Sequence, residues 1–417
     1  MEVTALGAIV ALTIAIVLIV KKIHPAYSLI AGAIFGGLIG GAGLTGTVDL
    51  MMSGAKDMIP AILRILTAGI LAGVLIQSGA ASKIAETIIE KIGESKALLA
   101  LALATMILTS VGVFVDVAII TVSSIALEMA RKTGLSKSAI LMAMAGGGKA
   151  GNIMSANPNT IAAADNFGVP LTSVMLAGVI PAIVGVIVAF LLAKKLSNKG
   201  TFVEKIEETE EAEEKPKFLP AIVGPLVAIV LLMLRPTVGI EVDPLLALPI
   251  GGICGALAMG KFKNLKKYAQ FGISNMSGVA ILLIGTGTLA GIIANSGLKD
   301  LVIQGITTLG LPSFALAPIS GILMGAATAS TTSGTAVAAS VFGPTILELG
   351  VSGLSGAAMI HAGSTVLDHL PHGSLFHSTA GCVDMDMKER FKLIPYESLV
   401  GLTLTVVSTV MFGFIIK

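Results

Sequence analysis

Apolar runs long enough to cross a lipid bilayer recur along the whole chain, and they restrict its fold more than any other feature. A membrane-spanning helix needs about 17–25 mainly apolar residues. The clearest runs are 3–20, 27–44, 172–193, 218–234, 244–260 and 399–416. Only 12% of the residues are charged, whereas a soluble domain carries about a quarter. We therefore predict an all-α polytopic membrane protein, because a transmembrane barrel would show alternating segments of about ten residues.

The chain also contains an internal repeat. LAGVLIQSG at 71–79 matches LAGIIANSG at 289–297, so the two start 218 residues apart (289 − 71). Segments 24–41 and 60–63 have counterparts that start 219 residues later, at 243 and 279, and segment 149–158 resembles 361–371, which has one extra residue. Residues 1–198 and 217–417 are therefore predicted to be two copies of one unit. The glutamate-rich stretch between them, 199–216, is predicted to be a cytoplasmic linker.

The positions of lysine and arginine predict how the chain sits in the membrane. They cluster at 21–22, 83–96, 131–137, 194–199, 261–267 and 388–392. Placing these clusters in the cytoplasm satisfies the positive-inside rule and puts both termini outside the cell membrane. It leaves 97–130 short for two spans and a turn, so we predict a re-entrant hairpin there, with two tilted spans as the alternative. An equivalent hairpin is predicted at 312–347.

Five spans and one hairpin per copy would make the two copies inverted relative to each other. Inverted repeats with broken helices are the architecture of secondary transporters, whose binding site lies near the midplane.

Four polar segments interrupt the apolar pattern, at 108–117, 146–160, 325–338 and 361–374. The first and third lie at the predicted hairpin tips. The other two contain Pro158 and Pro371, which prevent a continuous helix. Unwound backbone is tolerated at membrane depth only inside protein or beside a cavity. Free helix N-termini favour an anion there, so we predict that the four segments converge on one central site.

The polar side chains of these segments are the candidate substrate-binding residues. They are Lys149, Asn152, Ser155, Asn157, Asn159, Thr160, Thr331, Ser333, Thr335, Asp368, His369 and His372. Lys149 could balance a substrate carboxylate or could extend from a helix end to the membrane surface, and Arg64 is predicted to do the latter. No HExxH or CxxC motif accompanies the histidines, so no metal site is predicted.

Asp116 and His372 are the candidate proton-coupling residues. Asp116 lies in VFVDVAII with no opposite charge nearby in the sequence. Acids within membrane segments are functional candidates by default, although a structural carboxylate bonded to another helix is the alternative. An imidazole can exchange a proton near neutral pH, which makes His372 the second candidate.

Three stretches resemble the gluconate:proton symporter (GntP) family of the ion-transporter superfamily. They are LAGVLIQSGAASKIAETIIEKIG at 71–93, VGVFVDVAII at 111–120 and LDHLPHGSL at 367–375. The resemblance implies proton-coupled uptake of a small hydroxy acid by an elevator-like or rocking movement, in a homodimer. Position 116 carries Asp where the family has Glu, and 155–160 reads SANPNT in place of a segment rich in histidine, proline and glycine.

The leading hypothesis from the sequence is therefore a secondary active transporter in the cell membrane, and not an enzyme. It would need no cofactor, only a coupling ion, and a net charge of +2 implies no nucleic-acid partner. SANPNT is also similar to hairpin motifs of sodium-coupled dicarboxylate carriers, so sodium remains an alternative coupling ion. A cation/proton antiporter is the third possibility.

Overall fold

The computed structural model describes residues 3–203 and 215–416, and these ranges fold into helices without a named strand. The first half contains α1 (Ala5–Val20), α2 (Pro25–Ile39), α3 (Gly43–Asp57), α4 (Ile59–Gln77), α5 (Ala80–Ile92), α6 (Ala97–Ser110), α7 (Val115–Thr133), α8 (Lys137–Asn152), α9 (Pro158–Phe167), α10 (Leu171–Ala177) and α11 (Val179–Leu196). The second half contains α12 (Phe218–Val238), α13 (Pro244–Ala258), α14 (Leu265–Ala294), α15 (Leu298–Thr308), α16 (Leu316–Thr328), α17 (Thr331–Glu348), α18 (Gly353–Gly363), α19 (Ser374–Cys382) and α20 (Met387–Thr409). The predicted all-α fold class is confirmed.

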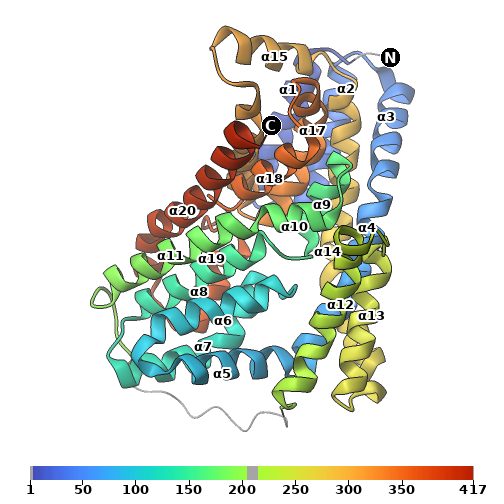
Figure 1. Cartoon of the computed structure of the whole chain (residues 1–417). Coiled ribbons are helices and arrows are strands. Elements are labelled where there is room, and N and C mark those ends of the chain that lie inside the picture. Colours follow the sequence, from blue (N-terminus) through green and yellow to red (C-terminus); the bar gives the residue numbers. More distant parts are fainter. Residues whose placement is uncertain (1–2, 204–214, 417) are drawn as a thin grey trace.

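The helices form two bundles joined by two crossing helices (Figure 1). The long-helix bundle comprises α1–α4 and α12–α14, in which α14 packs against α2, α3 and α4. The hairpin bundle comprises α6–α11 and α16–α20, in which α8 packs against α6, α11 and α20. α5 lies across one end of the molecule and α15 across the other. Each crossing helix therefore links one bundle to the other.

Backbone contacts between small residues hold the long-helix bundle together. A methyl group added at Gly272 of α14 would overlap the carbonyl oxygen of Gly69 in α4, and one at Gly291 would overlap that of Leu50 in α3. Small residues let membrane helices approach this closely. The high glycine content of the sequence is thus used to pack α14 against α3 and α4.

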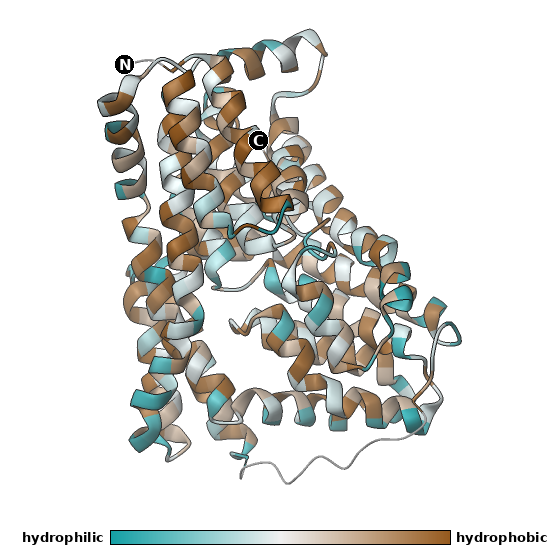
Figure 2. Ribbon diagram, turned by 180° about the vertical axis from the view of Figure 1, so that it is seen from behind, coloured by the Kyte–Doolittle hydropathy of each residue, from teal (hydrophilic) through white to brown (hydrophobic). Residues whose placement is uncertain are grey.

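Fewer helices are long enough to cross a bilayer than the sequence predicts. Five described helical segments have the required length and apolar composition, and six if α5 and α6, which are bent by 97°, form one span. Two copies of five spans would give about ten. Hydrophobic residues cover most helices in Figure 2, but α1, α2 and α13 have only 16, 15 and 15 residues, short of the roughly 20 that a full span needs.

The order of the helices in the first half recurs in the second. α5–α9 are followed 216–219 residues later by α15–α19, whose starts are 298, 316, 331, 353 and 374. Equivalent helices of the two halves also pack in a reciprocal way. α13 of the second half packs on α4 of the first, and their counterparts α2 and α14 pack on each other. The predicted linker, 199–216, falls mostly on residues outside the described ranges. In its described part, Thr201 donates hydrogen bonds from its backbone nitrogen and its hydroxyl to Glu389.

The two predicted hairpins are pairs of packed helices, α6 with α7 and α16 with α17. Gly112, with φ of +99°, lies in the first turn, and Ala329, with φ of +45°, forms the second. The two predicted helix breaks separate α8 from α9 and α18 from α19. Pro158 is the first residue of α9, a position that suits proline because its missing N–H needs no partner there. Pro371 lies in the longer second break, three residues before α19 begins.

Candidate functional site

Both hairpin turns and both helix breaks border one cavity of about 160 Å³. Its polar lining residues are Asp116, Asn152, Asn159, Ser330, Thr331, Thr332, Asp368 and Ser374. The cavity is smaller than the roughly 300–1,000 Å³ of most ligand pockets, so it suits a small solute. The structure thus brings together all four polar segments singled out in the sequence.

Four helices point their N-terminal turns at this cavity. α7, α9, α17 and α19 start at Val115, Pro158, Thr331 and Ser374, and a residue from the first two positions of each helix lines the cavity. A helix N-terminus carries unpaired N–H groups and a partial positive charge of roughly half an elementary charge. Four such termini around one cavity favour an anion there.

Lys149 is fully buried, with 1% of its side chain exposed, and its ammonium pairs with the Asp368 carboxylate. The ammonium also donates to the carbonyl oxygen of Thr365 at 2.7 Å and lies 3.0 Å from Nδ1 of His369. The idea that Lys149 extends from a helix end to the membrane surface is therefore wrong. In this structure Lys149 is not a free positive charge either, because the protein supplies its own carboxylate.

Asp368 connects that lysine to the second hairpin. Its other carboxylate oxygen accepts a hydrogen bond from the hydroxyl of Thr331, the first residue of α17. His369 lies behind this group, where Nδ1 is 3.1 Å from Asp368 and Nε2 is 3.0 Å from the carbonyl oxygen of Ile394 in α20. Asp368 and His369 thus connect the second break to α8, α17 and α20.

A second set of hydrogen bonds fastens the first break. Asn157 caps α9 by accepting from the backbone nitrogens of Asn159 and Thr160 at 3.0 and 3.1 Å. Its amide nitrogen donates to the backbone and side-chain oxygens of Asn152, both at 2.7 Å. The hydroxyl of Thr332 then donates to Asn159 at 2.6 Å. The first break is therefore bonded to the tip of the second hairpin.

Asp116 lies in the first turn of α7 and borders the cavity. Its carboxylate accepts a hydrogen bond from the backbone nitrogen of Val117 at 2.9 Å, and no ion pair joins it among the described residues. The helix dipole stabilises a carboxylate at this position. The structural alternative, a hydrogen bond to a side chain of another helix, is absent from the part of the chain that the structure describes.

Some predicted site residues lie away from the cavity lining. Ser155 and Thr335 are fully buried, and neither hydroxyl has a hydrogen-bond partner among the described residues. Ser333 supplies its backbone nitrogen to the Ser330 cap. Nε2 of His372 lies 3.2 Å from the carbonyl oxygen of Ala327 at the end of α16. That contact gives His372 a bonding partner at the hairpin tip, and its role in proton coupling stays a prediction.

Sequence reasoning missed three of the polar lining residues. Ser330 and Thr332 alternate with chosen threonine and serine positions in the third polar segment, and Ser374 ends the fourth. All three lie at helix starts, because Ser330 is the cap of α17, Thr332 is the second residue of α17 and Ser374 is the first residue of α19. For Ser330 a signal was present in the sequence, because serine is a preferred helix cap.

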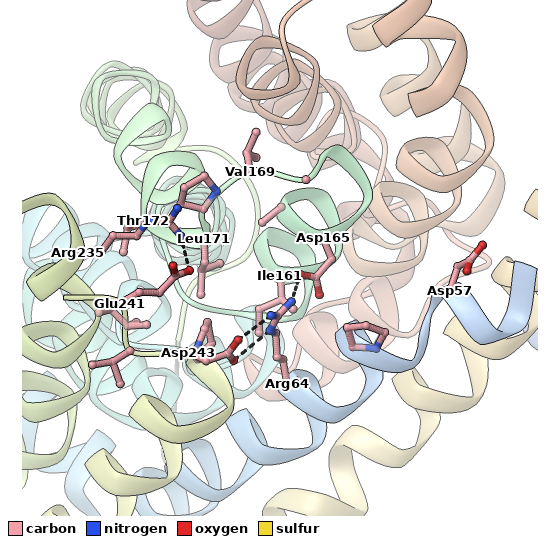
Figure 3. Close-up of a pocket in the computed structure, with 17 residues that line it drawn as sticks. Asp57, Arg64, Ile161, Asp165, Val169, Leu171, Thr172, Arg235, Glu241 and Asp243 are labelled. Carbon is pink, nitrogen blue, oxygen red and sulfur yellow. Dashed lines mark hydrogen bonds and ion pairs between the residues drawn. The ribbon is translucent and has the colours of Figure 1, made fainter. Parts of the chain in front are cut away.

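A larger cavity, of about 450 Å³, lies where α4 meets α9 and α13 (Figure 3). Arg64 of α4 projects into it and pairs with Asp165 of α9. The same guanidinium donates to both oxygens of Asp243, the cap of α13, at 3.1 and 2.6 Å. The prediction that Arg64 extends to the membrane surface is therefore wrong. Arg64 is a bridge between the long-helix bundle and the hairpin bundle.

Known proteins resemble the chain over nearly its whole length. It is 65% identical over 412 residues to an uncharacterized transporter of Haemophilus influenzae, covering 99% of this chain and 98% of that one. It is 25% identical to the low-affinity gluconate transporter of Escherichia coli strain K12, covering 98% and 97%. The crystal structure of the Alcanivorax borkumensis YdaH transporter matches the fold with a TM-score of 0.70 at 17% identity, over 96% of this chain and 98% of that one.

Two family models match the sequence. The model of the Na+-H+ antiporter family matches residues 219–309. The model of the GntP family permeases matches residues 3–248, which is more than half of the chain. With the length of its apolar helices, this match makes the chain a multi-pass membrane protein and a member of the GntP permease family.

Proposed function

We propose that the protein is a secondary active transporter that takes up a small organic anion of the gluconate or hydroxy-acid class together with protons. The observation that carries the proposal is the convergence of four helix N-termini on the 160 Å³ cavity. Their N–H groups are aimed at a carboxylate or at polarised hydroxyls. The name of the Escherichia coli relative, a gluconate transporter, supports this class of substrate.

The buried charges supply a reason for coupling to a cation. Asp116 and Asp368 both border the cavity, and Lys149 pairs with only one of them. A substrate carboxylate entering this site would stand beside an unpaired carboxylate, and like charges repel strongly away from water. A proton on Asp116 removes this repulsion.

A proton on Asp368 would have a second effect. It would weaken the bond to Lys149, and the freed ammonium could then pair with the substrate. Proton binding and anion binding would thus favour each other, and this reciprocity is the thermodynamic basis of symport. Two protonation sites are therefore assigned to the cavity, and His372 is a third candidate at the hairpin tip.

The exchanged helix contacts support inverted repeats and a moving hairpin bundle. α17 packs on α9 while α19 packs on α7, and α12 packs on α5 while α1 packs on α15. A two-fold axis between two copies produces such exchanges, and in inverted-repeat transporters that axis lies in the membrane plane. The hairpin bundle carries the cavity, so its movement against the long-helix bundle would carry the site across the membrane.

One observation favours a second candidate function. The match to the Na+-H+ antiporter family over 219–309 covers α12 except its first residue and all of α13, α14 and α15. An antiporter would exchange two cations through the same carboxylates and would carry no organic anion. The four helix N-termini at the cavity favour transport of an organic anion. Uptake experiments separate symport of an anion from exchange of two cations.

Changing Asp116 to Asn is expected to uncouple uptake from the proton gradient while the protein still folds. The amide keeps the shape of the side chain but cannot release a proton, so acidification outside the cell should no longer stimulate uptake. The measurement is the initial rate of labelled gluconate uptake at pH 5.5 and 7.5 in cells without their own carriers. Asp300→Asn on α15, away from the cavity lining, is the matched control. An unchanged ratio of the two rates in Asp116→Asn would remove this residue from the coupling mechanism.

A further inference from the structure

A third cavity, of about 690 Å³, lies outside the transport site, between the start of α6 and the ends of α7 and α11. We call it the α6–α11 groove. Leu98, Leu99, Leu135 and Phe190 form its apolar walls, and Lys96 and Lys194 line it as well. The groove therefore combines a hydrophobic surface with two cations.

Within the described part of the chain, no carboxylate balances the two lysines of this groove. Glu94 also lines it, but the ammonium of Lys132 lies 3.3 Å from that carboxylate. Within residues 3–203 and 215–416, neither Lys96 nor Lys194 has an ion-pair partner. The groove thus presents two ammonium groups that have no ion-pair partner among the described residues, and such groups are complementary to an anion.

The apolar surface continues along α11 from Lys194. Ile180, Ile183, Ile187 and Leu191 are 51%, 49%, 52% and 55% exposed. Their spacing of three and four residues places them on one face of the helix. Lys194, three residues after Leu191, ends this stripe. A long aliphatic surface that ends in a lysine matches the shape of a lipid, with its chain along the helix and its headgroup at the end.

We propose that the α6–α11 groove binds an anionic phospholipid, with the phosphate between Lys96 and Lys194 and an acyl chain along the leucines and α11. Basic pockets between membrane helices bind such headgroups elsewhere. The groove adjoins the 97° bend between α5 and α6, where Gly93 has φ of +83°. A bound lipid therefore restrains the bend between α5 and α6, and α5 is one of the helices that link the two bundles. The proposal rests on the membrane-embedded fold and is independent of the transported substrate.

The experiment measures the thermal unfolding midpoint of the full chain in a non-ionic detergent. Phosphatidylglycerol and phosphatidylcholine with the same acyl chains are added separately. A ligand that binds only the folded state raises the midpoint, so phosphatidylglycerol is expected to raise it by several degrees more than phosphatidylcholine. The double variant Lys96→Gln/Lys194→Gln should lose this difference. Lys195→Gln/Lys199→Gln removes the same charge next to the groove and should keep it.

Three results would overturn the assignment. The first is equal stabilisation of the wild type by the two lipids. The second is an undiminished phosphatidylglycerol effect in Lys96→Gln/Lys194→Gln. The third is the same effect from inorganic phosphate alone, which would mean that the groove binds a free anion and not a lipid. Native mass spectrometry of the same samples counts bound phosphatidylglycerol, and the double variant should retain at least one fewer molecule than the control.

Discussion

Replacing Lys149 with methionine is expected to abolish transport and to lower the free energy of unfolding by about 3–5 kcal/mol, as loss of one partner of a buried ion pair does. Methionine fills a similar volume but leaves the Asp368 carboxylate buried without its cation. The side chains of Lys149 and Asp368 are 1% and 3% exposed, so water cannot solvate the carboxylate that remains. Thermal unfolding in detergent and uptake in proteoliposomes measure the two losses.

The double variant Lys149→Met/Asp368→Asn separates folding from function. Removing both charges should restore most of the stability, because replacing a buried pair by neutral groups of similar volume is often close to neutral. Transport should remain absent, since the lysine that would receive the substrate carboxylate is gone. Recovery of transport in the double variant would show that the pair serves folding alone.

Cross-linking α4 to α9 is expected to stop transport completely. Arg64 and Asp165 form one of the contacts between the two bundles, so a bridge at this position would prevent the hairpin bundle from moving. The cysteine pair Arg64→Cys/Asp165→Cys would be made after Cys254 and Cys382 are changed to serine. Uptake is measured before and after addition of a cleavable bifunctional thiol reagent, and reduction should restore it.

The pair Arg64→Cys/Asp243→Cys is the matched control. Both double variants lose the ion pairs of Arg64, but Asp243 belongs to the long-helix bundle. A bridge to it joins two helices of the same bundle and should leave the cross-linked protein as active as the uncross-linked one. Full activity after a quantitative Arg64–Asp165 cross-link would contradict movement between the bundles.

The sequence identified several of the polar residues that line the central cavity, because polar residues are rare in an apolar chain. Serine, threonine and asparagine around Pro158 mark the first break, and Asn157 does cap the helix that follows. The internal repeat then predicted that the equivalent segments of the second half belong to the same site. Lining residues Asn152, Asn159, Thr331 and Asp368 were all named from these local signals.

Long-range partners could not be predicted in this way. Lys149 and Asp368 are 219 residues apart, and neither residue lies in a pattern that specifies the other. The partners of Arg64 lie 101 and 179 residues away, so an arginine near a span end was assigned to the membrane surface. The number of full-length spans was overestimated for a related reason. Hydropathy shows that a run is apolar, but it does not show at which residue the helix begins, as it does after the capping residue His24.

Uptake of labelled gluconate and related hydroxy acids by the purified protein in proteoliposomes tests whether the protein is a proton-coupled anion transporter. The vesicles carry an imposed proton gradient, an imposed sodium gradient or neither, and Lys149→Met vesicles provide the background. Proton symport should accumulate an organic anion above equilibrium when the outside is acidic, and little accumulation is expected with sodium alone. Proton-driven sodium flux without any organic anion uptake would contradict proton symport of an anion and would identify an antiporter.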